Sequence, residues 1–243
     1  GRVSTGLARL RAARRANGEV PPLGTGSVTE EQVPLAPSAL FTRALREPGL
    51  RLRAVTRDGR EVPLPVARWL GPPTGAEADA LADVQGPALD LGCGPGRHVA
   101  SLHHRGVLAV GVEIAAEAVR LARSRGALII EGSVFSPLPG EGTWRAVLLL
   151  DGNIGIGGRP RTLLNRVRSL MASDGHALVE VDPPGTTSHQ HEVRLEAGDE
   201  RSVWFPWATV SADAVDELAD TAKLRVSACW ERDRRWFARL VHA

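Results

Sequence analysis

The feature that most constrains this chain is an apolar strand that runs directly into a glycine-rich turn. The strand, residues 89–91, is followed by Gly92-Cys93-Gly94-Pro95-Gly96. Glycine permits a tight turn and lets a ligand approach the backbone where a side chain would collide. Glu113 ends the next apolar run, residues 107–112, and one carboxylate can accept hydrogen bonds from both hydroxyls of a ribose. Together these features predict a site for a nucleoside-bearing cofactor.

Two common nucleotide-binding motifs do not fit the turn. The dinucleotide fingerprint requires a third glycine at residue 97, which is arginine, and the P-loop requires a lysine, whereas Lys223 is the only one in the chain. An Asp-x-Gly-x-Gly-x-Gly turn with an acid ending the next strand resembles motif I of class I S-adenosylmethionine-dependent methyltransferases. The resemblance extends from about residue 87 to the C-terminus. Residues 135–142 and 150–158 are also similar to uncharacterised actinobacterial methyltransferases.

From Pro87 onward, short apolar runs alternate with helical patterns, which predicts a parallel sheet covered by helices. Continuous apolar runs are typical of strands that are buried on both faces. The predicted strands are Ala88–Leu91, Val107–Val112, Ala127–Ile130, Ala146–Leu150 and Ala177–Val181. The predicted helices between them are Arg97–His104, Ala115–Arg125 and Pro160–Met171.

The last part of the chain departs from this alternation. A predicted helix, Ala212–Leu218 with Ser211 as its cap, precedes two strand patterns, Leu224–Trp230 and Arg235–Val241. Strands joined by so short a turn must be antiparallel. The resemblance therefore implies an α/β fold, with a seven-stranded, mostly parallel Rossmann-like methyltransferase sheet, an antiparallel last strand, and an N-terminal helix and hairpin extension.

The sequence predicts that the chain consists of three parts. Residues 1–36 form a flexible extension, with a short helical pattern near 6–15 and a basic cluster at Arg9–Arg15 that reads either as a basic arm or as a solvated tail. Residues 37–86 form a lid, with a helix from Ser38, its predicted cap, to Arg46, a hairpin of Leu50–Thr56 with Glu61–Val66, and a helix at Ala76–Asp83. Residues 87–243 form the cofactor-binding domain, with an insert at 182–210.

The resemblance also implies which residues hold the cofactor, S-adenosyl-L-methionine. The methionine portion would lie on the glycine turn, the ribose on Glu113, and the adenine on residues that follow the second and third strands. Ser133 stands where many relatives have Asp, so it is either an adenine contact through its hydroxyl or an ordinary turn residue. The predicted cofactor-binding residues are Asp90, Gly92, Cys93, Gly94, Gly96, Glu113, Ile114, Ser133, Val134 and Asp151.

Methyl transfer requires a closely aligned acceptor and, for an acceptor that starts protonated, a general base. The predicted catalytic residues are Asp151, Asn153 and His189, with His191 as a further candidate base. The glycine-rich residues 150–158 would lie beside the methyl group or act as a flexible connector. Trp204, Phe205 and Trp207 in the insert would shape an acceptor pocket or form a small satellite core. No metal site is predicted, because His189-x-His191 lacks the spacing of a zinc helix.

Composition limits the partners. Thirty basic against 28 acidic residues give a net charge of +2, which does not favour a nucleic-acid partner. No apolar run is long enough to cross a membrane, and the two cysteines fit a reducing cytoplasm. The sequence therefore favours a cytoplasmic methyltransferase with a small-molecule acceptor, and it carries no signal for oligomeric state. The alternatives are a non-catalytic cofactor-binding regulator and a nicotinamide-dependent oxidoreductase.

Overall fold

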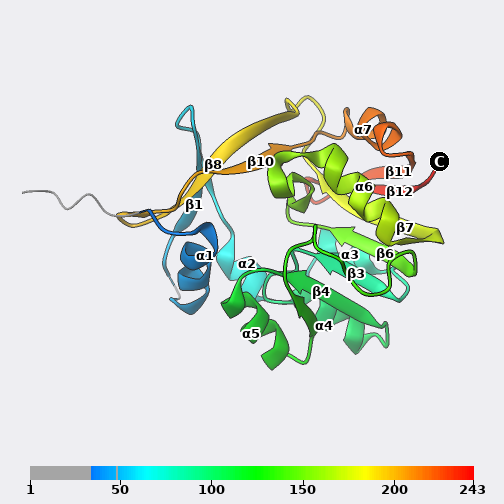
Figure 1. Ribbon diagram of the computed structural model, residues 1–243, viewed down its shortest axis with the longest axis horizontal. Helices are drawn as coiled ribbons and strands as arrows, with labels where there is room; N and C mark the ends of the chain where they lie inside the picture. The colour runs from blue at the N-terminus through cyan, green and yellow to red at the C-terminus, as the bar shows by residue number, and fades with distance from the viewer. Residues whose placement is uncertain (1–33, 48) are drawn as a thin grey trace, which may run out of the picture. The chain divides into compact units, whose positions relative to one another are not determined.

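The computed structural model describes residues 34–47 and 49–243, which contain two β-sheets and their flanking helices (Figure 1). The predicted helix near residues 6–15, the basic cluster and most of the predicted extension lie outside the described residues. Residues 34–36 of that extension are described, and Leu35 forms an isolated β-bridge with Ser202.

The larger sheet has seven strands in the order β11-β12-β7-β6-β3-β4-β5. Neighbours from β7 to β5 are parallel, whereas β12 is antiparallel to both β7 and β11. This confirms the predicted sheet. The last strand, β12, lies between β7 and β11 and is antiparallel to both. The strands are β3 (Ala88–Leu91), β4 (Ala109–Glu113), β5 (Leu128–Glu131), β6 (Trp144–Leu149), β7 (Met171–Val181), β11 (Leu224–Arg232) and β12 (Arg235–His242).

Helices cover both faces of this sheet because successive strand residues point to opposite sides. Leu89 and Val147 pack in one core with α6 (Pro160–Leu170) and α7 (Val215–Thr221). Ala88 and Leu148 pack in a second core with α3 (Ala76–Leu81), α4 (Arg97–His104) and part of α5 (Ala116–Ser124). No helix in the described residues is long and apolar enough to cross a membrane.

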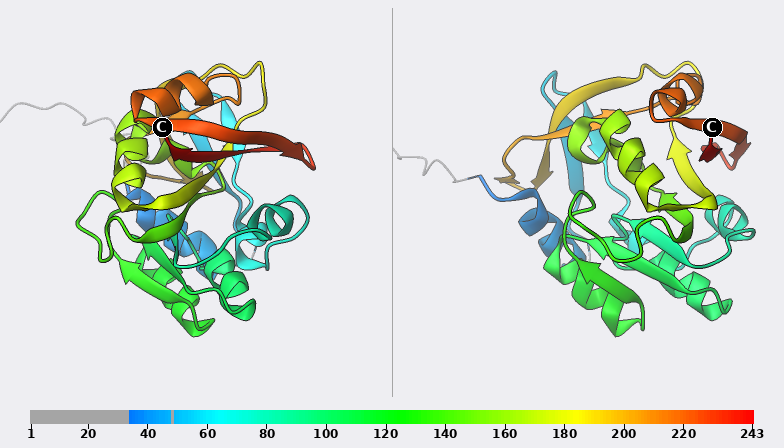
Figure 2. Two further views of the ribbon diagram at one scale, coloured as in Figure 1. Left: turned by 90° about the vertical axis from the view of Figure 1, so that its right-hand side faces the viewer. Right: turned by 45° about the vertical axis from the view of Figure 1, so that its right-hand side comes forward.

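The smaller sheet joins two segments that are far apart in the sequence. Its strands are β1 (Leu52–Thr56), β2 (Glu61–Pro63), β8 (His189–Ala197), β9 (Glu200–Arg201) and β10 (Phe205–Thr209). All of its pairs are antiparallel, and β1 pairs with β8 from Leu52–Ala197 to Thr56–Val193. The predicted hairpin is thus one edge of a sheet whose other strands come from the insert, and those insert strands were not predicted (Figures 1 and 2).

Two predicted helix caps are wrong. The first helix, α1 (Pro37–Arg46), begins one residue earlier than predicted, so Ser38 lies in its first turn and makes no capping bond. The helix α7 begins at Val215, and Ser211 instead donates its backbone N–H to the Ser188 hydroxyl at 2.8 Å. A short helix that the sequence pattern did not indicate, α2 (Val66–Leu70), follows the hairpin.

Candidate cofactor and acceptor site

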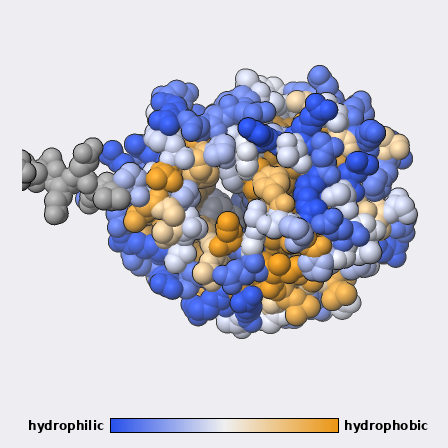
Figure 3. All heavy atoms as spheres, viewed as in Figure 1, coloured by the Kyte–Doolittle hydropathy of each residue, from blue (hydrophilic) through white to orange (hydrophobic). Residues whose placement is uncertain are grey.

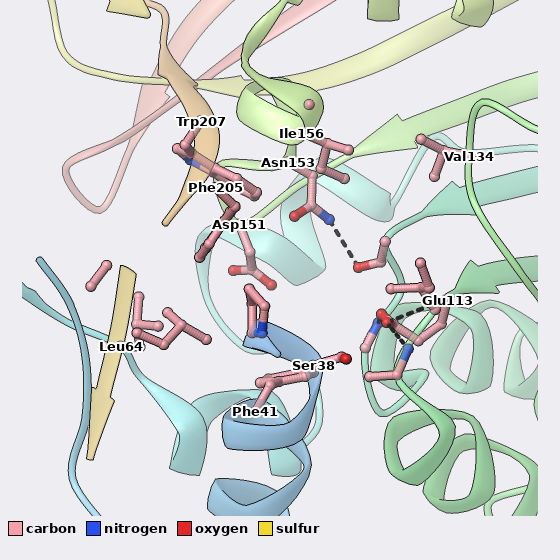
Figure 4. A pocket seen from close by; sticks show the side chains of 18 of the residues that line it. Ser38, Phe41, Leu64, Glu113, Val134, Asp151, Asn153, Ile156, Phe205 and Trp207 are labelled. Atoms are coloured by element: carbon pink, nitrogen blue, oxygen red, sulfur yellow. Dashed lines mark hydrogen bonds between the residues drawn. The ribbon is translucent and has the colours of Figure 1, made fainter. Parts of the chain in front are cut away.

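The strand order of the larger sheet reverses between β3 and β6, which is where an open α/β sheet binds its ligand. The carboxyl ends of these strands open into a cavity of about 590 Å³, within the range of small-molecule sites. The smaller sheet and α1 form the opposite wall (Figure 4). Hydrophobic side chains gather around a depression on this face of the molecule (Figure 3).

The three glycines of the turn serve three different purposes. A Cβ at Gly96 would lie 2.7 Å from the Ala122 Cβ, so this glycine allows close packing against α5 and does not line the cavity. A Cβ at Gly92 would lie 2.8 Å from the Asn153 side chain. At Gly94, where φ is +53°, nothing lies within 4 Å of the added atom, so the backbone faces open space. Gly92 and Gly94, two of the predicted cofactor-binding residues, line the cavity, whereas Gly96 is a packing residue.

Glu113 lies at the end of β4 with only 8% of its surface exposed, and it lines the cavity. Its carboxylate accepts backbone hydrogen bonds from Gly94 at 2.9 Å and from Ile114 and Ala115 at 2.8 Å each. Burial raises the pKa of Glu113, and these three bonds oppose the increase. The carboxylate therefore holds the glycine turn in shape and also faces the space in which a ribose would lie.

The predicted adenine contacts gather at one end of the cavity. Ile114 is 67% exposed, while Val134 (Figure 4) is buried, and both residues line the cavity. The Ser133 hydroxyl accepts the Phe135 backbone N–H at 3.2 Å, so Ser133 stabilises a turn and also lines the cavity. Cys93 lines the cavity as well, and burial raises the pKa of its thiol, which makes it a poor nucleophile.

Asp90 does not line the cavity, contrary to prediction. Its side chain is 1% exposed, and one carboxylate oxygen pairs with Nδ1 of His98 at 3.3 Å. The second oxygen of Asp90 and Nε2 of His98 have no hydrogen-bond partner among the described residues. Because Asp90 lies inside β3 rather than beyond its end, its carboxylate is turned toward α4 instead of toward the ligand space.

Asp151 lines the cavity but is already occupied by arginines. One carboxylate oxygen accepts from Arg97 at 2.7 Å, and the other accepts from Arg68 at 3.0 Å and Arg235 at 3.2 Å. Its backbone N–H donates to Glu180 at 2.6 Å. The three guanidinium groups occupy both carboxylate oxygens, so the geometry does not favour Asp151 as a general base.

These groups belong to a charge cluster of Arg68, Glu77, Arg97, Asp151, Glu180 and Arg235. We call it the buried charge cluster because its centre is buried, although the Arg68 side chain at its edge is 42% exposed. At its centre, Glu77 accepts hydrogen bonds from Arg97 and Arg235 with 1% of its side chain exposed. Burial acts to raise the pKa of Glu77, but the two arginines outweigh it and hold the pKa at about 2. Glu77, His98 and Asp151 place ligand-type atoms within 4.8 Å of one another, yet arginines already neutralise both carboxylates.

Asn153 connects the two strand ends that flank the cavity. Its side-chain nitrogen donates to the carbonyl oxygens of Leu91 and Gly92 at 2.9 Å each. Its amide oxygen points away from that bond and toward Asp151 and the opposite wall (Figure 4). Asn153 therefore positions the glycine turn and leaves an acceptor atom directed into the cavity.

The glycine-rich stretch after β6 contains a tight 3-10 segment, η1 (Asn153–Gly158), that packs against β10. A Cβ at Gly155 would lie 2.3 Å from the Ala208 carbonyl oxygen, and one at Gly158 would lie 2.7 Å from Pro206. The glycines thus let the smaller sheet approach the end of β6. This contradicts the alternative of a flexible connector.

The two histidines of the insert face different environments. His189 does not line the cavity, and its Nδ1 lies 3.0 Å from the Thr187 carbonyl oxygen. His191 lines the cavity together with Phe205, Trp207 and Thr209 of β10. Burial lowers the pKa of His191, and the nearby His189 and Arg60 lower it further.

Sequence reasoning missed several cavity residues that lie outside the glycine turn. Phe41 and Trp69 come from the predicted lid and pack edge to face, with ring centroids 5.7 Å apart. Arg97, which excluded the dinucleotide motif, is also a wall residue, as is His98. The period-two alternation of His191, Val193 and Leu195 was a readable signal of a strand with one inward face.

Comparison with known proteins agrees with this architecture. Residues 89–179 match a family model described as methyltransferase domain. No sequence among curated proteins matches the chain. A Bacteroides fragilis SAM-dependent methyltransferase, solved with S-adenosyl-L-homocysteine, is 21% identical, covering 85% of this chain and 94% of its own, with a TM-score of 0.69. The CcbJ methyltransferase of Streptomyces caelestis is 18% identical, covering 72% and 92%, with a TM-score of 0.56.

The glycopeptide N-methyltransferase MtfA is 17% identical, covering 68% of this chain and 87% of its own, with a TM-score of 0.52. At these identities the likenesses concern the fold alone. The similarity to actinobacterial proteins that the sequence suggested stays a prediction. Residues 89–179 are thus a methyltransferase domain, within a chain that has the fold of class I S-adenosylmethionine-dependent methyltransferases.

Proposed function

We propose that this protein transfers a methyl group from S-adenosyl-L-methionine to an oxygen or nitrogen atom of a small molecule. The observation that carries the proposal is a single cavity with two unlike walls. A glycine turn and a buried carboxylate form one wall, and an aromatic sheet forms the other. The first wall suits a nucleoside with an amino-acid tail, and the second suits an apolar acceptor.

The residues present fit this cofactor. The backbone at Gly94 faces open space that any side chain would fill, and Glu113 lies beside it. The methionine portion would lie along Gly92, Cys93 and Gly94, with the adenine between Ile114 and Val134. When bound, the cofactor supplies an electrophilic methyl group. Asp90 and Gly96 would act indirectly, by supporting the turn from behind.

The protein's own contribution is to orient the acceptor and to exclude water. Residues 37–86 and the insert at 182–210 together form the wall opposite the cofactor residues, so we propose that they act as the lid and the acceptor site. Asn153 would fix the turn beside the reacting atoms. Holding two reactants in line accounts for much of the rate that such a site can supply.

The unpaired cysteines Cys93 and Cys229 support a cytoplasmic location.

Calorimetric titration of the purified protein with S-adenosyl-L-methionine and, separately, with NADH tests the proposal. We expect binding of the first at micromolar concentrations and no heat from the second, because Arg97 replaces the glycine that a dinucleotide requires. Tight NADH binding without a response to S-adenosyl-L-methionine would overturn the proposal. Binding of S-adenosyl-L-methionine with no transfer to any small molecule would instead favour a regulatory cofactor-binding protein.

A further inference from the structure

His191 is a cavity-lining ionisable side chain with no hydrogen bond among the described residues. The two carboxylates in the cavity wall are occupied, Glu113 by backbone N–H groups and Asp151 by arginines. Nδ1 of His98 is paired with the Asp90 carboxylate, while Nε2 of His98 is buried without a partner among the described residues. Nδ1 of His191 is buried without a partner, and Nε2 makes no hydrogen bond either. This imidazole is therefore available for proton transfer with an acceptor.

The surroundings of His191 lower the pKa of its ring. Burial lowers the pKa of His191; His189 on the same strand and Arg60 of the β1–β2 turn lower it further, while Asp58 of that turn raises it. The residues of β10 and η1 that pack near it carry no ionisable side chain, and Arg159 and Glu192, the latter paired with Arg57, lie with it on an adjoining shallow hollow. A neutral imidazole at neutral pH can accept a proton.

The charge of the cavity selects among acceptors. Because both carboxylates in its wall are occupied, nothing there offers an ammonium group a free anionic partner, and burying such a charge unpaired is costly. Arg60 also lines the wall, and the described residues place no carboxylate within 4.0 Å of it. A cation would be repelled at this position, whereas a developing oxyanion would be stabilised.

The shape of the wall indicates an apolar, planar body. Phe41, Trp69, Phe205 and Trp207 present aromatic rings, and the Phe205 and Trp207 rings pack edge to face at 6.3 Å. Aliphatic side chains fill the spaces between the rings, namely Ala54, Val62, Leu64, Val193 and Leu195. Such a surface favours a flat ring system, which can stack on these side chains.

The geometry points to a planar apolar acceptor with a weakly acidic hydroxyl, a phenol or an enol, whose proton is taken by His191. This inference rests on the proposed function. In the transfer, the hydroxyl proton moves to the free ring nitrogen of His191 as an oxygen electron pair forms the bond to the methyl carbon. The carbon–sulfur electron pair stays on sulfur, which loses its positive charge, and the imidazolium later releases the proton to water.

A matched pair of probes tests the acceptor class. 2-Naphthol carries an acidic hydroxyl, whereas 2-(aminomethyl)naphthalene has the same ring system and arrives as an ammonium ion. With the protein saturated in S-adenosyl-L-homocysteine, quenching of tryptophan fluorescence should report binding of the naphthol and at least tenfold weaker binding of the amine. With S-adenosyl-L-methionine, only the naphthol should be methylated. Equal binding or methylation of the amine would overturn the inference.

Variants of two histidines test the base. His191→Gln should lower the rate of naphthol methylation about 100-fold, while naphthol binding changes little. His104→Gln is the matched control, because His104 is an exposed residue at the end of α4 that does not line the cavity, and it should retain most of the activity. Retained activity in His191→Gln would contradict the role of His191. If His191→Gln folds poorly, Arg60→Met is tested in its place. We expect this variant to bind naphthol more weakly. Unchanged naphthol binding would contradict the inference.

The ionisation of His191 gives a readout that does not need turnover. An NMR titration of the histidine ring protons should show His191 losing its proton at a lower pH than an ordinary histidine does, and naphthol binding should perturb that signal but not that of His104. The activity should fall as the pH drops through the same midpoint. If S-adenosyl-L-methionine binds but naphthol does not, this inference fails alone; if S-adenosyl-L-methionine does not bind, the proposed function fails first.

Discussion

The two walls of the cavity differ in how they are built. We name the walls after their proposed ligands, the cofactor and the acceptor. The cofactor wall comes from residues 92–95, 112–115 and 132–135, which follow three neighbouring strands of one sheet. It presents backbone groups, one buried carboxylate and few large side chains. The acceptor wall comes from two segments more than a hundred residues apart, 37–69 and 191–209, and it presents aromatic and aliphatic side chains.

This difference determines which of the two walls can be predicted from the sequence. Backbone that must approach a ligand requires glycines at fixed positions, which leave a motif. A side-chain wall requires only apolar residues of suitable size, and many combinations meet that need. The residues matched by the methyltransferase family, 89–179, include all of the cofactor wall and none of the acceptor wall. If the two walls are independent, changes on one side should leave the other side's ligand unaffected.

The largest effect should come from the buried charge cluster, which lies beneath both halves. Arg97→Met leaves the buried Glu77 and Asp151 short of a partner, so we expect a loss of about 3–5 kcal/mol in the free energy of unfolding. Urea denaturation measures this loss in the free energy of unfolding. The control is Arg46→Met, whose ion pair with Glu117 has a 63% exposed arginine and should cost under about 1 kcal/mol. Equal losses in both variants would contradict the importance assigned to the cluster.

The pH dependence of stability tests the same cluster by another route. The pKa of Glu77 is about 2 in the folded protein, below its value in the unfolded chain, so its contribution is present above pH 4.5 and disappears as the pH falls toward 2. We expect a loss of about 3 kcal/mol from this group across that window. Comparing the thermal unfolding of the wild type and Glu77→Gln isolates it. Parallel curves for the two proteins would refute the assignment.

On the cofactor side, Glu113→Ala should weaken binding of S-adenosyl-L-methionine by about 1.5–3 kcal/mol, because a charge-assisted contact to the ribose is lost. Glu131→Ala is the matched control, since Glu131 lies opposite Glu113 in the sheet register but is exposed. Calorimetry measures both. Because Glu113 also holds the glycine turn, the Glu113→Ala protein must first show a normal melting temperature. Unchanged affinity would remove Glu113 from the ribose site.

On the acceptor side, Trp207→Ala should weaken 2-naphthol binding about tenfold, through the loss of one aromatic contact of about 1.4 kcal/mol. Cofactor affinity should be unchanged, which is the sharpest test of independent walls. Trp204→Ala serves as the control, because the Trp204 ring lies 4.0 Å from the guanidinium of Arg57 and outside the cavity. A parallel loss of cofactor affinity in Trp207→Ala would show that the walls are coupled.

The success of prediction followed the same division. Ala88–Leu91 and Arg97–His104 were predicted to the residue, because a buried strand and the helix after a glycine turn are specified locally. The insert strands were missed because β9 and β10 pair with β8, and β8 in turn pairs with β1, about 140 residues away. His189 and His191 lie on the same face of β8, with ring centroids 4.4 Å apart, and the sequence does not show how far along that strand the cavity extends.

The role of Asp151 also could not be read from its neighbours in the sequence. It was predicted to be catalytic because it follows a buried strand beside the expected methyl group. Its three arginine partners come from α2, the start of α4 and β12, and no local pattern links these positions. Long-range ion pairs of this kind leave no period and no motif in a single sequence.

The buried charge cluster also sets an order on how the protein is made. Arg235, which bonds Glu77, Asp151 and Glu180, belongs to the last strand of the chain. During synthesis, Arg68 and Arg97 emerge before Asp151 and can pair with it at once, whereas Glu180 waits for its arginine until β12 has left the ribosome. The charge cluster is therefore completed only when β12 is made, and a nascent chain that stops before β12 would leave the buried centre of the cluster short of one arginine.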